Sequence, residues 1–209
     1  MNEYIFPSRK SELANALTHS LGIIFSIAVF IVVTYNSKFS VNQKFPLYVF
    51  AICMFLLYLS STIYHSIKNI ELKILFRLFD HINIYFLIAG SYTPFLLLCV
   101  KGFLGWFFFG VLWTVAIMGI FYKIFLWKKY PKYSLYIYIG MGWLLVFVAK
   151  PMYDTFSIMG WMWLLIGGLS YTFGTIFYSW KSKPYTHAIW HLFVLAGSVC
   201  HFMAVLYIK

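Results

Sequence analysis

The chain is built from long apolar stretches separated by short polar breaks that contain Lys, Gly or Pro. A helix needs about 20 apolar residues to cross a bilayer. Within lipid every backbone polar group must be paired, which restricts spanning segments to helices and closed barrels. The stretches are long enough for helices, and we predict seven spans. They cover residues 17–35, 46–65, 75–100, 104–127, 135–149, 159–180 and 186–208.

This pattern predicts an all-α membrane protein, a seven-transmembrane helix bundle that forms one integral membrane domain over residues 1–209. Of the 209 residues, 63% are hydrophobic and 10% are charged, whereas about 25% are charged in a soluble domain. Composition therefore excludes a soluble enzyme, a secreted disulfide scaffold and a disordered regulator. The three cysteines lie inside apolar stretches, which favours buried hydrophobic packing over a disulfide or thiolate metal site.

The positions of the basic residues predict the orientation of the bundle. Most of the 16 Lys and Arg residues lie before the first span, or near or beyond the ends of the second, fourth and sixth spans. These residues are Arg9, Lys10, Lys68, Lys73, Arg77, Lys123, Lys128, Lys129, Lys132, Lys181 and Lys183. Because basic loops stay in the cytoplasm, we expect a cytoplasmic N-terminus and a C-terminus outside.

The net charge of +11 is scattered between spans rather than clustered. This distribution argues against nucleic acid as a partner and for membrane lipids. A homo-oligomer remains open, and no obligate protein partner is indicated.

Ionisable side chains inside spans cost about 2.5–3.5 kcal/mol each near the bilayer centre and are functional candidates by default. Four of them stand out: His65 ends the second span, Asp80 lies near the start of the third, and His187 and His191 open the seventh. With the predicted orientation, all four lie near the cytoplasmic ends of their helices. Three separate spans thus bring nitrogen and oxygen ligands to one depth.

The spacing of these residues predicts a zinc site. His187 and His191 are four residues apart and share one helical face. With His65 they offer three imidazoles and leave a fourth position for water, as in catalytic Zn²⁺ sites. Asp80 is the predicted hydrogen-bond partner of that water or acceptor of its proton, and Ser61 is predicted to hold the carboxylate.

Five further polar residues receive simpler interpretations. His19 is interpreted as an interfacial residue at the start of the first span, and His81 as a packing or interface residue. His201 lies ten residues beyond His191 and is interpreted as unrelated to the site. Solvated loop charges account for Glu12 and Asp154.

Several short motifs together resemble the bacterial hemolysin III family, the prokaryotic branch of the progestin and adipoQ receptor superfamily. They are ExxNxxTH from Glu12 to His19, SSxxYH from Ser60 to His65, the isolated Asp80, GSYTPF from Gly90 to Phe95, Gly142–Trp143, GGxxYxxG from Gly167 to Gly174, and HxxxH from His187 to His191. The resemblance covers nearly the whole chain.

The resemblance implies seven helices in the bacterial cytoplasmic (inner) membrane, with a zinc ion near the cytoplasmic side. Residue by residue, it places the ligands at His65, His187 and His191, the water-positioning carboxylate at Asp80 and its supporting hydroxyl at Ser61. Related adiponectin receptors and alkaline ceramidases share this kind of site and hydrolyse lipid amides.

Three functions follow from these observations. The favoured one is an intramembrane zinc hydrolase that acts on a lipid amide or ester. The alternatives are a pore-forming or haemolytic channel with a structural zinc, and a sensor of membrane state in which zinc locks helices together. Polar residues gathered at one end of the bundle argue against a conducting path.

Overall fold

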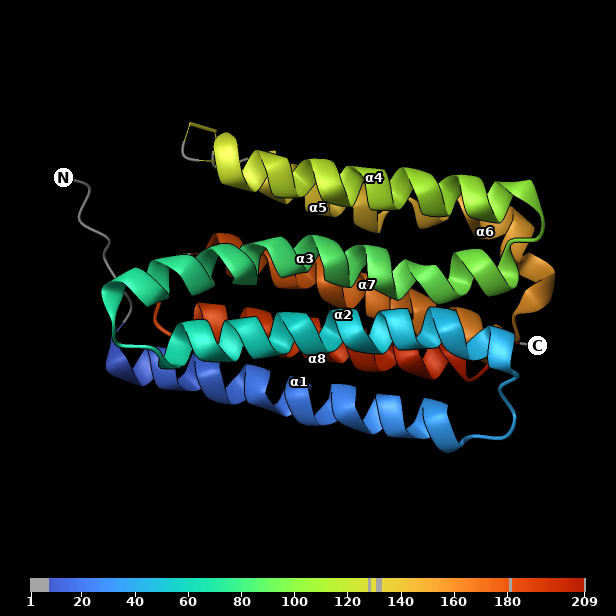
Figure 1. Cartoon of the computed structure of the whole chain (residues 1–209), viewed down its shortest axis with the longest axis horizontal. Helices are drawn as coiled ribbons and strands as arrows, with labels where there is room; N and C mark the ends of the chain where they lie inside the picture. Colours follow the sequence, from blue (N-terminus) through green and yellow to red (C-terminus); the bar gives the residue numbers. More distant parts are fainter. Residues whose placement is uncertain (1–7, 128, 131–132, 181, 209) are drawn as a thin grey trace.

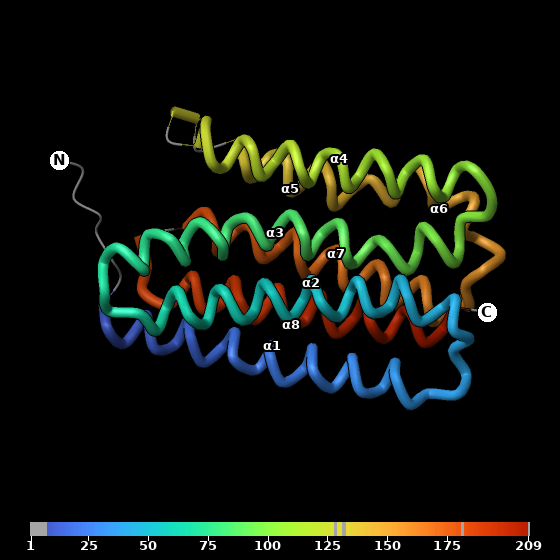
Figure 2. The backbone as a smooth tube through the Cα atoms, viewed as in Figure 1, coloured from blue at the N-terminus to red at the C-terminus, as the bar shows by residue number. Residues whose placement is uncertain are grey.

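The structure, a computed structural model, describes residues 8–127, 129–130, 133–180 and 182–208, and this part of the chain is almost entirely helical. Three of the basic residues used to predict the orientation, Lys128, Lys132 and Lys181, lie outside the described residues. The helices form a bundle of long, nearly aligned rods (Figures 1 and 2). They are α1 (Arg9–Tyr35), α2 (Val41–Ser66), α3 (Ile70–Cys99), α4 (Phe103–Phe125), α5 (Tyr133–Gly142), α6 (Leu145–Met152), the short 3₁₀ helix η1 (Tyr153–Thr155), α7 (Ile158–Ser179) and α8 (Thr186–Val205).

The centre of the bundle is formed by α2, α3 and α8. In the most apolar window of α3, 72% of the residues are buried, compared with 22% for α4. The helix α1 packs on α2 and α8, α4 packs on α3, and α7 packs on α8. Large apolar side chains such as Ile24, Phe107 and Met118 remain exposed on the outer helices, as expected for surfaces that face lipid.

Among the described residues, six segments are long and apolar enough to cross a membrane: α1, α2, α3, α4, Tyr133–Thr155 and α8. The predicted span 159–180 forms a 22-residue helix, α7, but it is not one of the six. Its Gly, Ser, Thr and Tyr residues dilute the apolar ones. The all-α membrane architecture is therefore confirmed, with six candidate spans instead of seven.

The predicted span 135–149 is broken between α5 and α6. The hydroxyl of Tyr92, on α3, donates to the carbonyl of Gly142 and accepts from the backbone N–H of Leu145 at 3.0 Å. A side chain inserted into the helical hydrogen-bond ladder is a common cause of such a break. Tyr92 thus fastens this region to the central helix α3.

The first helix begins before the apolar stretch that predicted the first span. The helix α1 starts at Arg9, capped by Ser8, whose side chain accepts from the N–H of Ser11 at 3.3 Å. The added turns carry Glu12 and Asn15 at helical spacing before His19, so these polar side chains share a face. That face points into the bundle, where Asn15 and His19 are buried.

Candidate metal centre

The three predicted histidine ligands lie together at the end of the bundle where α1, α3 and α8 begin. His65 comes from the last turn of α2, and His187 and His191 come from the first two turns of α8. One ligand nitrogen from each histidine lies within 4.8 Å of the others. His65 and His191 are buried, and His187 is partly buried. The helix ends thus bring three imidazoles close enough to share one ion.

Hydrogen bonds fix which nitrogen of two of these rings can bind a metal. His65 Nδ1 lies 2.6 Å from Glu12 Oε2, and His191 Nδ1 lies 3.1 Å from the carbonyl oxygen of Asn15. Carbonyl and carboxylate oxygens only accept, so each Nδ1 carries the proton and each Nε2 keeps its lone pair. Among the described residues, His65 Nε2 has no hydrogen-bond partner. Both rings therefore present Nε2, the usual arrangement when another group orients a ligating histidine.

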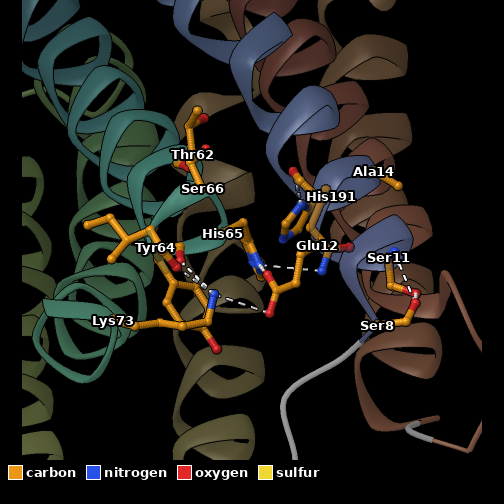
Figure 3. Close-up of polar contacts among 12 residues, drawn as sticks. Ser8, Ser11, Glu12, Ala14, Thr62, Tyr64, His65, Ser66, Lys73 and His191 are labelled. Carbon is orange, nitrogen blue, oxygen red and sulfur yellow. Dashed lines mark hydrogen bonds and ion pairs between the residues drawn. The ribbon is translucent and has the colours of Figure 1, made fainter. Parts of the chain in front are cut away.

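Glu12 joins the site to a buried lysine, as Figure 3 shows. Its second oxygen, Oε1, lies 3.2 Å from the Nζ of Lys73, which also donates to the carbonyl of Tyr64 at 3.0 Å. The Glu12 side chain is only 12% exposed. Its interpretation as a solvated loop charge is therefore wrong. The burial of Glu12 was predictable from the sequence, because Glu12, Asn15 and His19 are three and four residues apart. This helical spacing extends the first helix towards the N-terminus and places the three side chains on one face.

Asp80 and Ser61 lie beside the histidines but are not joined by a hydrogen bond of standard length. Asp80, on α3, is 6% exposed and lines the same cavity as His187 and His191. Its carboxyl lies near the His65 ring and the Ser61 hydroxyl and interacts electrostatically with the cations of Lys123 and Arg77. The Ser61 hydroxyl is fully buried and has no hydrogen-bond partner among the described residues. A carboxylate thus stands next to the imidazole cluster, with an available hydroxyl behind it.

A fourth histidine packs on the cluster. The ring of His19 stacks on that of His191, with centroids 3.4 Å apart, and its edge meets Tyr58. His19 is 2% exposed, and neither of its ring nitrogens has a hydrogen-bond partner among the described residues. It is therefore a buried residue of the site and not an interfacial one. By contrast, His81 packs near the ring of Trp127, as expected for a packing residue.

An elongated cavity of about 310 Å³ opens beside the histidine cluster. It reaches Asp80, His187 and His191 at one end and His201 further along α8. Between them its walls are mostly Leu, Ile, Val and aromatic side chains of α3, α7 and α8 and of the α5–α6 region. A volume in this range is typical of a small-molecule site. The histidine cluster and Asp80 therefore lie at one end of a mostly apolar cavity.

Comparison with known proteins identifies the family. A family model described as "Haemolysin-III related" matches residues 8–202, nearly the whole chain. The chain belongs to the haemolysin III family. The predicted family is thereby confirmed, and this haemolysin III chain is a multi-pass membrane protein of the bacterial type.

Relatives match the haemolysin III chain over almost its full length. It is 46% identical over 200 residues to "Hemolysin-3" of Bacillus cereus, covering 95% of this chain and 91% of that protein. It is 44% identical to "Hemolysin-3 homolog" of Bacillus subtilis (strain 168), covering 95% and 94%. The human "Monocyte to macrophage differentiation factor" is 30% identical over 207 residues, covering 95% and 84%. The similarity thus extends beyond bacteria.

The contact between Glu12 and His65 yields a testable prediction. In Glu12→Gln the side chain keeps its size but loses the charge that holds the His65 proton on Nδ1. We expect the affinity for Zn²⁺ to fall about 10- to 100-fold, the usual effect of removing such a partner. Competition titration of the purified protein against a chelator measures this. Glu71→Gln, at an exposed position on α3, is the matched control; equal affinities in the two variants would show that Glu12 does not support the site.

Proposed function

We propose that this haemolysin III protein is a zinc-dependent hydrolase that cleaves a lipid amide or ester at the cytoplasmic side of the membrane. One observation carries the proposal: a cluster of three imidazoles stands beside a buried carboxylate at the end of an apolar cavity. The cluster supplies a place for the ion, the carboxylate supplies a proton acceptor, and the cavity supplies room for an acyl chain.

The chemistry of the donor set supports zinc. His65, His187 and His191 would hold the ion, since imidazole suits Zn²⁺ and three protein ligands are typical of catalytic zinc sites. A carboxylate orients the His65 ring, and a backbone carbonyl orients the His191 ring. Histidines that bind zinc commonly donate their other ring N–H to a group of this kind. When bound, Zn²⁺ supplies a Lewis acid that polarises the substrate carbonyl and promotes ionisation of water.

The remaining steps belong to the protein side chains. Asp80 takes a proton from the attacking water while the water oxygen bonds to the carbonyl carbon. The carbon–nitrogen or carbon–oxygen bond then breaks, and Asp80 returns the proton to the leaving amine or alcohol. Ser61 holds the carboxylate in place.

The topology proposed here has seven crossings with a cytoplasmic N-terminus and a C-terminus outside. Three features support it. The helix α7 has 22 residues, or roughly 33 Å at 1.5 Å per residue, enough to cross the hydrocarbon core. The start of α1 and the end of α8 lie at opposite ends of the bundle (Figure 1). Among the described residues, most of the basic ones lie at the end of the bundle that holds the histidines, which would place the site on the cytoplasmic side.

The experiment that tests the hydrolase is turnover of a fluorogenic long-chain amide and the corresponding ester by the purified protein in lipid nanodiscs. We expect hydrolysis that a zinc chelator removes and that added Zn²⁺ restores. Absence of turnover of either compound by zinc-loaded protein, or turnover that survives complete removal of the metal, would contradict the proposal.

The name of the Bacillus cereus relative, "Hemolysin-3", favours membrane lysis as a second candidate function. Under this proposal the protein permeabilises bilayers without any chemical step. Dye release from vesicles that contain the purified protein would test it. Equal release by the wild-type protein and Asp80→Asn would favour lysis without hydrolysis, whereas absence of release would remove this candidate.

A further inference from the structure

We propose that Gly168 of α7 sets the length of the acyl chain that the cavity accepts, because it leaves open the passage from the histidine cluster to the far part of the cavity. The ligand class that fits is a single unbranched acyl chain that is long enough to pass this residue, with its amide or ester group at the cluster. The inference rests on the proposed function in one respect, namely that the cavity holds the acyl chain of the substrate.

The glycines of the GGxxYxxG motif in α7 have different surroundings. A Cβ at Gly167 would overlap the ring of His201, and a Cβ at Gly174 would lie 2.8 Å from the ring of Trp190, both on α8. These two glycines therefore let α7 and α8 approach closely. A Cβ at Gly168 would meet no heavy atom of another helix within 4 Å among the described residues. Helix packing thus accounts for the first two glycines but not for Gly168.

Gly168 lies in the middle of the face that α7 turns towards the cavity. At about 100° per residue, Leu164 and Thr172 lie one turn before and one turn after Gly168 on the same side of the helix. All three residues line the cavity. The face that packs on α8, with Gly167 and Gly174, lies about 100–120° away around the helix. A side chain at position 168 would therefore enter the cavity.

The position of Gly168 along α7 divides the cavity into two parts. The ring centroid of Tyr178 lies 6.4 Å from that of His187, so Tyr178 marks the level of the histidine cluster on α7. Gly168 precedes Tyr178 by ten residues, which corresponds to about 15 Å at 1.5 Å per residue. The cavity continues past Gly168 along apolar side chains such as Leu165 to Trp161. A long ligand that starts at the cluster must therefore pass Gly168.

The distance from the cluster to Gly168 separates short acyl chains from long ones. An extended chain advances about 1.2 Å per bond. With its carboxyl group at the cluster, an eight-carbon chain spans roughly 8 Å and ends before Gly168, whereas a sixteen-carbon chain spans roughly 18 Å and passes it. A bulky side chain at position 168 would therefore obstruct only the longer chain.

The experiment measures the binding of tritiated octanoic acid and hexadecanoic acid to zinc-loaded protein in nanodiscs by scintillation proximity. Such acids are products of the proposed reaction, so the protein does not consume them. In Gly168→Phe we expect the affinity for hexadecanoic acid to fall roughly 5- to 150-fold, the usual cost of overpacking a filled space. The affinity for octanoic acid should stay as in the wild-type protein. Gly168→Leu, a second bulky variant, should show the same selective loss.

Gly110→Phe, on α4, is the matched control. A Cβ at Gly110 would likewise meet nothing within 4 Å among the described residues, but this glycine is exposed and is not one of the residues that line the cavity. We expect this variant to bind both acids as the wild-type protein does. Because phenylalanine and leucine both favour a helix more than glycine does, none of the substitutions should hinder folding, which the melting temperature checks.

Unchanged binding of hexadecanoic acid in Gly168→Phe, an equal loss of both acids, or a wild-type protein that binds neither acid would overturn the inference. Binding is measured without turnover, so the two proposals fail separately. Selective loss of hexadecanoic acid in a protein that shows no hydrolysis would sustain the role of Gly168 and reject the hydrolase. Hydrolysis by the wild-type protein together with unchanged binding in Gly168→Phe would do the reverse.

Discussion

Replacing His191 by alanine is expected to remove zinc from the purified haemolysin III protein. Three imidazoles converge here, and His191 is 1% exposed, held by the Asn15 carbonyl and stacked on His19. Two remaining imidazoles make a weaker chelate, so we expect affinity to fall by more than about 100-fold, beyond the loss caused by removing a supporting residue. Elemental analysis should give about one zinc per wild-type chain and almost none in His191→Ala.

His81→Ala is the matched control for this substitution. His81 lies next to Asp80 in the sequence and lines the same cavity, but it is not part of the three-histidine group. We expect this variant to keep its zinc. Retention of a full equivalent in well-folded His191→Ala, judged by helical content and melting temperature, would show that the ion binds elsewhere.

Asp80→Asn is expected to lower kcat for lipid amide hydrolysis about 10²- to 10⁴-fold, the usual contribution of a positioned proton acceptor. Asparagine preserves the shape of the side chain but cannot take a proton from water. Since Asp80 is absent from the three-histidine group, zinc content should remain near that of the wild-type protein. Steady-state kinetics and elemental analysis on the same preparation measure both quantities.

The control for Asp80 is Asp154→Asn, which changes an exposed carboxylate on η1 in the same way. It should leave turnover and zinc content unchanged. If Asp80→Asn lost its zinc, Asp80 would be a ligand instead of a proton acceptor. If the variant retained both zinc and full turnover, the assigned role of Asp80 in catalysis would be wrong.

The predictions that rested on hydropathy and on helical spacing describe much of the molecule. Apolar stretches predicted the all-α membrane architecture, since in lipid the backbone has few alternatives. The four-residue spacing of His187 and His191 and the depth of His65 led to the group that the structure brings within 4.8 Å. These features are local, or follow from where each helix begins and ends.

Features that depend on distant contacts escaped prediction. The break after Gly142 is made by Tyr92, 50 residues away in the sequence. Glu12 and His19 were misinterpreted because the first span was started at its apolar stretch, which hid the buried polar face of the first turns of α1. His201 looked unrelated to the site because sequence spacing alone does not reveal that one cavity runs along α8 from the histidine cluster.

The measurement that tests the central claim most directly is anomalous diffraction at the zinc absorption edge from crystals of the purified protein. The account predicts one strong anomalous peak among His65, His187 and His191, about 2.0–2.1 Å from one nitrogen of each ring. A zinc peak elsewhere, or zinc-loaded crystals without a peak between these three side chains, would contradict it.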